Sequence, residues 1–449
     1  MKIIIAGAGD VGFHLAKLLS YESQDIYIID QSATRLEYIN SHLDVITLKG
    51  DATSVSLLKQ ANVEHADLLL AVTESQNTNF TIASIGKKLG VKKTIARINN
   101  SEFLTNTDVD FKSIGIDFMI SPEALAAEEI KSLLNQSVFN DAIPFENGDL
   151  MILGGTLSNN SPLINKTVKE SRMLFPDFSY ISVALRREYS KNTIIPRGNT
   201  RFEADDQVYF AVPGSSTDNI YTLLGKEKFG VKDVMILGGS TIGQKTANKL
   251  CKDHFNVKII EINRNRAFEI SETISDALVI NGDGRDVELL EEENIDEMDA
   301  FVAVTGNSET NIMSCLVAKS KGVKKTIALV ENMDYINISQ TIGIDTLINK
   351  KLLAASSIFK HVRKGDVVSM ASTHNMDAEI LEFEVKPNTP VTKHPIKDLK
   401  LTRDAVFSGV VRDDKIMMTY GDFQIQAGDK VIVFALQEAV HKVEDLFNH

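Results

Sequence analysis

Residues 1–20 read MKIIIAGAGDVGFHLAKLLS, and this stretch decides the fold. The apolar run KIIIA is typical of a buried parallel strand, and residues 13–20 have the apolar spacing of a helix. Between them stands G-x-G-x-x-G, in the strand-to-helix position that binds dinucleotides in Rossmann domains. There Gly7 makes the tight turn, Gly9 lets a pyrophosphate approach the backbone, and Gly12 lets the helix pack on the strand.

This first glycine turn (residues 7–12) predicts a bound nucleotide. The free N–H groups and the positive end of the helix dipole would hold its phosphates. A second strand ends at Asp30, eighteen residues past Gly12, where a carboxylate can accept hydrogen bonds from the ribose hydroxyls of an adenosine. The alternative is a purely structural turn in an empty Rossmann domain. The predicted ligand residues of this segment are Gly7, Ala8, Gly9, Asp10, Val11, Gly12 and Asp30.

Composition limits the possible functions. The length of 449 residues allows about three or four domains. The net charge of −13 argues against nucleic acid as a main partner, because binding its phosphates needs a basic face. No apolar stretch is long enough to cross a membrane, and the N-terminus does not resemble a signal peptide. The nine histidines and two cysteines show no metal-ligand spacing, so we expect no metal site and two buried free thiols in a reducing cytoplasm.

Strands and helices alternate up to about residue 120, which predicts a parallel sheet. Polar residues come where these strands end, at the edge where open α/β sheets bind ligands. Asp51 and Ala52 follow the third strand, Thr73 ends the fourth and Arg97 closes the fifth, and we add these four to the predicted site. From about residue 140 a small α+β module begins, with an Asn-Gly hairpin signal within residues 145–149.

The chain then repeats itself. A second glycine turn, GGSTIG at residues 238–243, follows an apolar run, and Glu261 stands eighteen residues past its last glycine. The string KKTIA occurs at residues 92–96 and again at 324–328. The offset between matching positions stays at 231 or 232 and is 228 near the end of the domain. The chain is therefore a tandem duplication of a nucleotide-binding domain and a small module, and Glu261 is the predicted ribose carboxylate of the second copy.

Two glycine turns, each with a GDA-type and an AVT-type turn and each followed by a small module, resemble the TrkA family. Its members are regulatory subunits of the Trk potassium-uptake system, built from RCK (regulator of potassium conductance) domains. The resemblance covers essentially the whole chain. It implies an α/β fold with two Rossmann-like doubly wound parallel-sheet domains, each followed by a small α+β RCK-C domain. The expected domains are residues 1–136, 137–220, 230–362 and 363–449.

The resemblance also implies a homo-oligomeric ring, expected to be a tetramer, that docks on a membrane-embedded potassium-conducting Trk subunit. The chain would be cytoplasmic and peripheral on the inner face of the cell membrane through that subunit. It would gate the subunit by binding NAD (NAD+ or NADH) and ATP or ADP. The family's pattern places Asp51 at the adenine, with helix capping as the other interpretation. It places Arg97 on phosphate, with a surface ion pair as the other interpretation.

A sensor fits these residues better than an enzyme does. Neither copy carries the phosphate-hydrolysing P-loop pattern, and the small modules offer no recognisable acid–base arrangement, so we expect no catalytic residues. The leading alternative is an NAD-dependent oxidoreductase. A nucleotide-sensing transcription regulator would need a basic helix-turn-helix, which the sequence lacks.

The two copies are not equivalent. Ser240 occupies the position of Gly9 and Leu329 that of Arg97, so the second turn is more crowded and has lost a cation. We therefore expect the first copy to be the stronger NAD(H) site and the second to be weak, altered or empty. The helix expected at residues 122–136 has a broad apolar face, which indicates a crossover or dimer-interface helix or an ordinary packing helix.

Overall fold

The computed structural model describes residues 1–20, 25–100, 102–105, 108–136, 138–187, 190, 192–332, 343–359, 367–372, 378–399, 401, 403–413 and 415–448. Within these ranges no helix is long and apolar enough to cross a membrane. The expected domain boundary at residues 362–363 lies outside the described residues.

The first sheet has six parallel strands in the order β3-β2-β1-β4-β5-β6. Both β2 and β4 pair with β1, so the strand order reverses there, as in a doubly wound fold. The side chains of Ile3, Ile4 and Ile5 are fully buried, as expected for a strand covered on both faces. The strands are β1 (Lys2–Ala6), β2 (Asp25–Asp30), β3 (Ile46–Lys49), β4 (Leu68–Ala71), β5 (Lys93–Arg97) and β6 (Phe118–Ile120).

Helices of the first copy begin at serine caps. The hydroxyls of Ser32, Ser54 and Ser75 each accept a hydrogen bond from the backbone N–H three residues on, which satisfies one of the open donors of a helix start. The helices are α1 (Asp10–Ser20), α2 (Ala33–His42), α3 (Val55–Gln60), α4 (Gln76–Lys88), α5 (Glu102–Thr105) and α6 (Pro122–Asn135).

The second copy repeats this topology, with the strand order β14-β13-β12-β15-β16-β17. Its strands are β12 (Asp233–Leu237), β13 (Asn256–Glu261), β14 (Ala277–Asn281), β15 (Ala300–Ala303), β16 (Lys325–Leu329) and β17 (Thr346–Ile348). Its helices are α9 (Thr241–Lys252), α10 (Arg264–Thr273), α11 (Val287–Glu292), α12 (Ser308–Ser320) and α14 (Lys350–Phe359). The predicted pair of Rossmann-like parallel sheets is confirmed.

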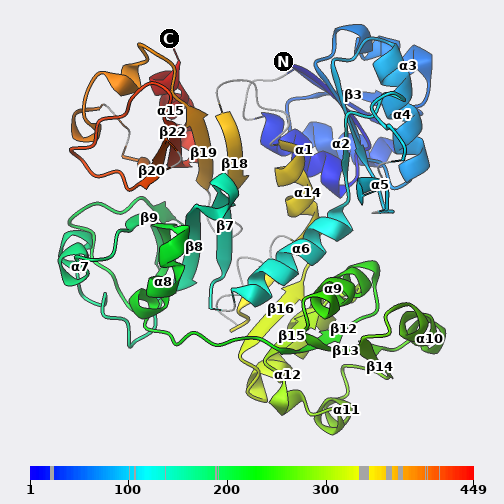
Figure 1. Ribbon diagram of the computed structural model, residues 1–449. Coiled ribbons are helices and arrows are strands. Elements are labelled where there is room, and N and C mark those ends of the chain that lie inside the picture. Colours follow the sequence, from blue (N-terminus) through cyan, green and yellow to red (C-terminus); the bar gives the residue numbers. More distant parts are fainter. Residues whose placement is uncertain are drawn as a thin grey trace. The chain divides into compact units, whose positions relative to one another are not determined.

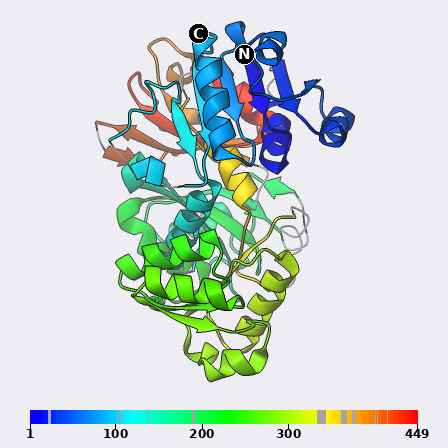
Figure 2. The same cartoon turned by 90° about the vertical axis from the view of Figure 1, so that its right-hand side faces the viewer.

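The chain forms two compact units whose limits do not follow the repeat. The first unit joins residues 1–129 to residues 240–249 and 348–363 of the second copy. Within it α14 packs against α1, which both ribbon views show (Figures 1 and 2). On α6, Glu128 bonds Lys249 of α9 at 2.5 Å. Helix α6 therefore contacts the other copy, as predicted for a crossover helix.

The second unit holds the two small modules, each built on a five-stranded antiparallel sheet. The predicted hairpin near residues 145–149 joins β7 to β8. One apolar core combines both sheets, from Ile152 and Tyr209 to Ile380 and Phe434. The strands are β7 (Asp141–Phe145), β8 (Leu150–Thr156), β9 (Ile181–Arg186), β10 (Thr193–Ile194), β11 (Gln207–Pro213), β18 (Val367–Ser372), β19 (Ala378–Glu384), β20 (Ala405–Arg412), β21 (Lys415–Met417) and β22 (Lys430–Leu436), and the helices are α7 (Val168–Leu174), α8 (Thr217–Leu224) and α15 (Val440–Phe447).

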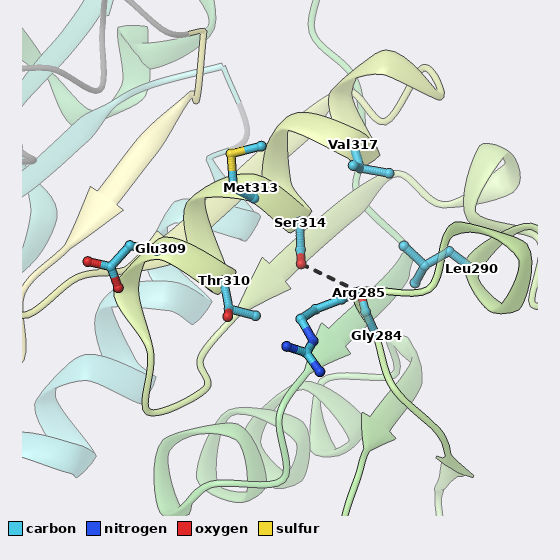
Figure 3. Close-up of a pocket in the computed structure, with 8 residues that line it drawn as sticks. All are labelled: Gly284, Arg285, Leu290, Glu309, Thr310, Met313, Ser314 and Val317. Atoms are coloured by element: carbon cyan, nitrogen blue, oxygen red, sulfur yellow. Dashed lines mark hydrogen bonds between the residues drawn. The ribbon is translucent and has the colours of Figure 1, made fainter.

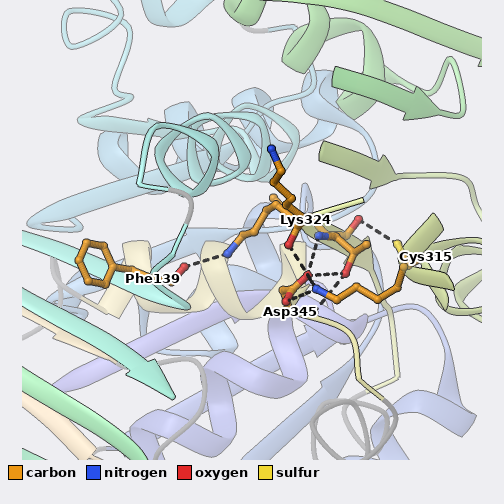
Figure 4. Close-up of polar contacts among 8 residues, drawn as sticks. Phe139, Cys315, Lys324 and Asp345 are labelled. Carbon is orange, nitrogen blue, oxygen red and sulfur yellow. Dashed lines mark hydrogen bonds and ion pairs between the residues drawn. The ribbon is translucent and has the colours of Figure 1, made fainter. Parts of the chain in front are cut away.

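A buried lysine ties the second sheet to the segment that leads into β7. Lys325 of β16 is 1% exposed, and its Nζ donates to the carbonyl of Phe139 at 2.9 Å (Figure 4). Burial lowers the pKa of Lys325 to about 8, against the attraction of Asp345. The carboxylate of Asp345 also bonds the ammonium of Lys319 at 2.7 Å. A charged group is therefore held in the core of the second unit by one carbonyl and the field of nearby carboxylates.

Candidate nucleotide sites

The first glycine turn has the backbone that its sequence predicts. Gly7 has a φ of +115°, and a Cβ there would lie 3.0 Å from the amide nitrogen of Thr73. A Cβ on Gly12 would lie 1.9 Å from the carbonyl oxygen of Gly7. At Gly9, by contrast, the nearest neighbour of an added Cβ is Nη1 of Arg35, at 3.9 Å. The turn therefore needs glycine at its first and last positions and leaves open space over the middle one.

The structure joins Asp30 to this turn. Its Oδ2 accepts a hydrogen bond from the backbone N–H of Ala8 at 2.6 Å, and its Oδ1 accepts one from Ser32 at 2.8 Å. Two N–H groups thus fix the carboxylate, while each oxygen keeps a lone pair for a further donor such as a ribose hydroxyl. Ala8 takes part through its backbone, and the side chain of Val11 is 6% exposed and belongs to the core.

Asp10, the first residue of α1, bonds to the second half of the chain. Its Oδ2 lies 2.6 Å from Nζ of Lys351 on α14. The hydrogen bond from Lys351 lowers the pKa of Asp10, although partial burial opposes it. One turn further along α1, burial lowers the pKa of His14, so this histidine is neutral near pH 7. The cation nearest to Asp10 therefore comes from α14.

Thr73 lies in a structural network that the sequence analysis missed. Asn79, which is fully buried, accepts hydrogen bonds from the N–H and the hydroxyl of Thr73 at 2.9 and 2.6 Å. It donates to the carbonyls of Thr73 and Arg97 at 3.1 and 2.9 Å. Asn311 makes the same four contacts in the second copy, at 2.6–3.1 Å. The asparagine of the AVT-type turn therefore ties the ends of two neighbouring strands together.

Arg97 is directed toward α6. Its Nη2 lies 3.6 Å from Oε1 of Glu123, and both side chains are less than one-fifth exposed. Nε of Arg97 and Oε2 of Glu123 are buried and have no hydrogen-bond partner among the described residues. The alternative of a surface ion pair is therefore wrong in one respect, since the pair is largely buried. Phosphate binding by Arg97 stays a prediction.

The turn after β3 is shaped by Asp51. Its Oδ1 accepts from the N–H and hydroxyl of Thr53 at 2.9 and 2.8 Å, which lowers the pKa of Asp51. The interpretation of Asp51 as a helix cap is wrong, because Ser54 caps α3. Ala52 is 6% exposed and packs in the core. The adenine role of this turn stays a prediction.

Arg35 is a candidate ligand residue that the sequence analysis did not name. It stands in the first turn of α2, is half exposed, and has its Nη2 3.4 Å from Oε1 of Glu74. Its other terminal nitrogen faces the open space over Gly9, where a pyrophosphate would approach. In the second copy the matching Arg266 lies 4.0 Å from Glu261. An arginine directly after a helix cap looks like ordinary surface, so only its matching position in the repeat could have indicated it.

The second copy keeps the carboxylate arrangement. Oε2 of Glu261 accepts from the N–H of Gly239 at 2.8 Å, and Oε1 accepts from Asn263 at 2.8 Å. Gly238 has a φ of +104°, as Gly7 has in the first copy. That the second copy binds NAD(H) more weakly than the first stays a prediction.

A cavity of about 280 Å³ lies elsewhere in the second copy (Figure 3). Its lining comes from the turn after β14 and from helices α11 and α12. The guanidinium of Arg285 is held by both oxygens of Asp283, at 2.7 and 3.0 Å. Ser314 lies 3.5 Å from the carbonyl of Gly284. No predicted ligand residue lines this cavity.

The described residues include neither a candidate metal site nor a disulfide. Among them, no group of three His, Cys, Asp or Glu side chains could hold a metal ion. Cys315 is buried and Cys251 is partly exposed, and neither forms a disulfide. Burial raises the pKa of both thiols, so they are protonated near neutral pH.

The fold and the two turns define a class of protein, the tandem Rossmann proteins with paired small modules. Family models match along the chain: the TrkA-N domain at residues 3–122 and 234–350, and the TrkA-C domain at residues 156–225 and 380–448. The chain belongs to the TrkA family.

Curated relatives match the whole chain, and solved structures of similar fold cover most of it. Proteins called Trk system potassium uptake protein TrkA from Azorhizobium caulinodans and Halomonas elongata are 30% and 32% identical to it. Each alignment covers 100% of this chain and 98% of the relative. A structure described as the GsuK channel bound to NAD has a TM-score of 0.60 at 15% identity and covers 99% of this chain and 78% of its own. One described as GsuK bound to ADP has a TM-score of 0.50 at 12% identity, with 80% and 68% covered.

Proposed function

We propose that this chain is the nucleotide-sensing regulatory subunit of a potassium-uptake system and binds NAD+ or NADH at the first glycine turn. The observation that carries this proposal is the position of Asp30. The N–H groups of Ala8 and Ser32 fix its carboxylate at the end of β2, beside a turn whose middle glycine faces open space. This is the arrangement that holds the ribose and pyrophosphate of a dinucleotide.

The potassium assignment rests on the relatives, which are named as parts of the Trk potassium-uptake system. The partner would be a membrane-embedded potassium-conducting subunit. The chain would meet it from the cytoplasm as a homo-oligomeric ring, a tetramer. NAD and ADP are the ligands named for the GsuK structures of similar fold, which supports NAD(H) and an adenine nucleotide as effectors.

The described residues also favour binding over catalysis. The polar groups at the carboxyl edge of the first sheet are engaged with backbone or with each other, as Thr73 is with Asn79. His14, the histidine nearest the turn in sequence, is partly buried on α1 beside Asp10. We propose that the protein is not an enzyme, and that its domains are residues 1–136, 137–220, 230–362 and 363–449.

The test is a titration of the full chain with NADH, followed by the fluorescence of the nicotinamide. The chain has no tryptophan, so the protein background is low. Asp30→Ala should weaken binding at least tenfold, since it removes the ribose acceptor and an anchor of the turn. Asp25→Ala is the matched control, because this exposed carboxylate stands at the other end of β2.

The same variants are then assayed for potassium uptake in cells that lack their own uptake system. We expect Asp30→Ala to lose the nucleotide-dependent part of uptake and Asp25→Ala to keep it. Full nucleotide response in Asp30→Ala would refute the site. Turnover of NADH with a small-molecule substrate would favour the oxidoreductase alternative.

A further inference from the structure

A lysine from the second half of the chain forms an ion pair with the first glycine turn. Asp10 directly follows Gly9, and its carboxylate is 2.6 Å from the ammonium of Lys351 on α14. The side chain of Lys351 is 13% exposed, whereas that of Asp10 is 68% exposed. The lysine is therefore held in place by the packing of α14 on α1, and the carboxylate faces solvent at the mouth of the turn.

The matching position of the repeat carries the opposite charge. At the offset of 228, Lys351 corresponds to Glu123 of α6. Glu123 faces α9 of the second copy, where burial lowers the pKa of Lys245 and the carboxylate of Glu123 opposes that effect. The first turn thus meets a cation from the second copy, while the helix of the second turn meets an anion from the first copy.

The lysine at this matching position changes the net charge beside a phosphate bound at the first turn. Alone, Asp10 would repel the diphosphate of a dinucleotide from the open space over Gly9. With Lys351 bound to it, the pair is neutral, and its ammonium adds a donor at the start of α1, where the helix dipole already favours anions. Arg35 supplies a second positive group over the same glycine.

We propose that Lys351 is a ligand residue of the first nucleotide site, delivered by the second copy to the diphosphate. The inference rests on the proposed function, because it assigns one more contact at the same site. If Lys351 contacts the diphosphate, nucleotide affinity at the first turn depends on the packing of α14 against α1.

The experiment compares two probes on the full chain, NADH and adenosine, which shares the ribose and the base but lacks the phosphates. The variants are Lys351→Met, Lys351→Arg and, as matched control, Lys249→Met. Lys249 also forms an interhelical ion pair, with Glu128 of α6, and does not contact Asp10. Binding is measured at low salt and again at about 0.5 M salt, where exposed charges are screened.

At low salt, Lys351→Met should bind NADH about tenfold more weakly than the wild type, with a smaller dependence on salt. Lys351→Arg and Lys249→Met should stay within twofold of it. Adenosine should bind all four proteins equally, which also shows that the first copy is folded. Equal NADH affinity in Lys351→Met and the wild type would overturn the inference, as would an equal loss for adenosine.

A second variant covers the case in which Lys351→Met does not fold. Asp10→Asn removes the carboxylate and leaves the ammonium, so it should bind NADH several-fold more tightly than the wild type. Weaker or unchanged binding would overturn the inference. If the wild type binds neither probe, the proposed function itself fails, whereas binding by wild type with no effect at Lys351 or Asp10 rejects only this contact.

Discussion

A buried carboxyl group in the second small module, Glu382, leads to a pH-dependent prediction. Glu382 of β19 is 2% exposed, and its Oε1 has no hydrogen-bond partner among the described residues. Burial raises the pKa of Glu382 to about 8, and a hydrogen bond shared with Glu146 adds to the rise. Glu146 in turn is paired with Lys430 at 2.8 Å. Near pH 7, Glu382 is thus a neutral acid beside an ion pair.

The sign of the effect follows from proton linkage. Between the ordinary pKa of 4.5 and the folded value near 8, the folded chain keeps a proton that the unfolded chain has lost. Stability therefore falls as the pH rises through this range, and the loss is complete above pH 8. At 1.36 kcal/mol per unit, a shift of about 3.5 units sets an upper limit of about 5 kcal/mol. Glu146 titrates together with Glu382, which reduces the net value.

The perturbation is Glu382→Gln, which keeps the shape and removes the titration. We expect the variant to match the wild type at and below about pH 4.5 and to be more stable at pH 9, by about 1–4 kcal/mol. Because a chain with four separate sheets is not expected to unfold in one step, the assay is hydrogen exchange of the amides in β19 and β22, resolved by mass spectrometry. Glu384→Gln, at the exposed end of β19, is the control. The same pH dependence in Glu382→Gln and the wild type would refute the reasoning.

Three further outcomes are expected. Asn79→Ala should lower the local stability of the first sheet by about 2–4 kcal/mol, since it removes four hydrogen bonds. Asn77→Ala, at an exposed position, should change it by less than about 0.5 kcal/mol, as hydrogen exchange of the amides in β4 and β5 would show. Lys325→Met should raise stability below pH 8, where the buried ammonium is charged, and the gain should shrink as the pH rises toward 10.5, as hydrogen exchange of the amides in β16, compared with the wild type at each pH, would show. Ser240→Gly should increase the NADH stoichiometry of the full chain in calorimetry, because it reopens the second turn, and an unchanged stoichiometry would contradict crowding as the cause.

The sequence was sufficient for the features that depend on local patterning. Gly7 and Gly12 could be assigned because their spacing fixes a backbone that tolerates no side chain, and Asp30 because a strand of regular length ends there. The matching strings of the two copies predicted the second sheet in the same way. Each of these assignments depends on residues close together in the chain.

The missed features depend on contacts between distant segments. Lys351 is 341 residues from Asp10, and nothing in either segment shows that α14 packs on α1. Glu382 looks like an ordinary strand residue until the second module brings it to Glu146. The role of Asn79 could not be assigned from the sequence, because a polar residue after a strand fits ligand binding as well as it fits the bonding of two strand ends. The sequence pattern thus predicts which edge of a sheet binds a ligand, but not which polar groups at that edge are already hydrogen-bonded within the protein.

The packing of α14 on α1 bears directly on how a ligand could act through this chain. A nucleotide can shift an equilibrium between two conformations only by the difference in its affinity for them. A contact confined to the first copy would be equal in both conformations if the copies moved as rigid bodies. A contact supplied by α14 is made only in the conformation that seats this helix on α1, so the affinity difference arises at Asp10 itself. Coupling of 1–3 kcal/mol per site is usual for such switches, and a single ammonium beside a diphosphate is enough to supply it.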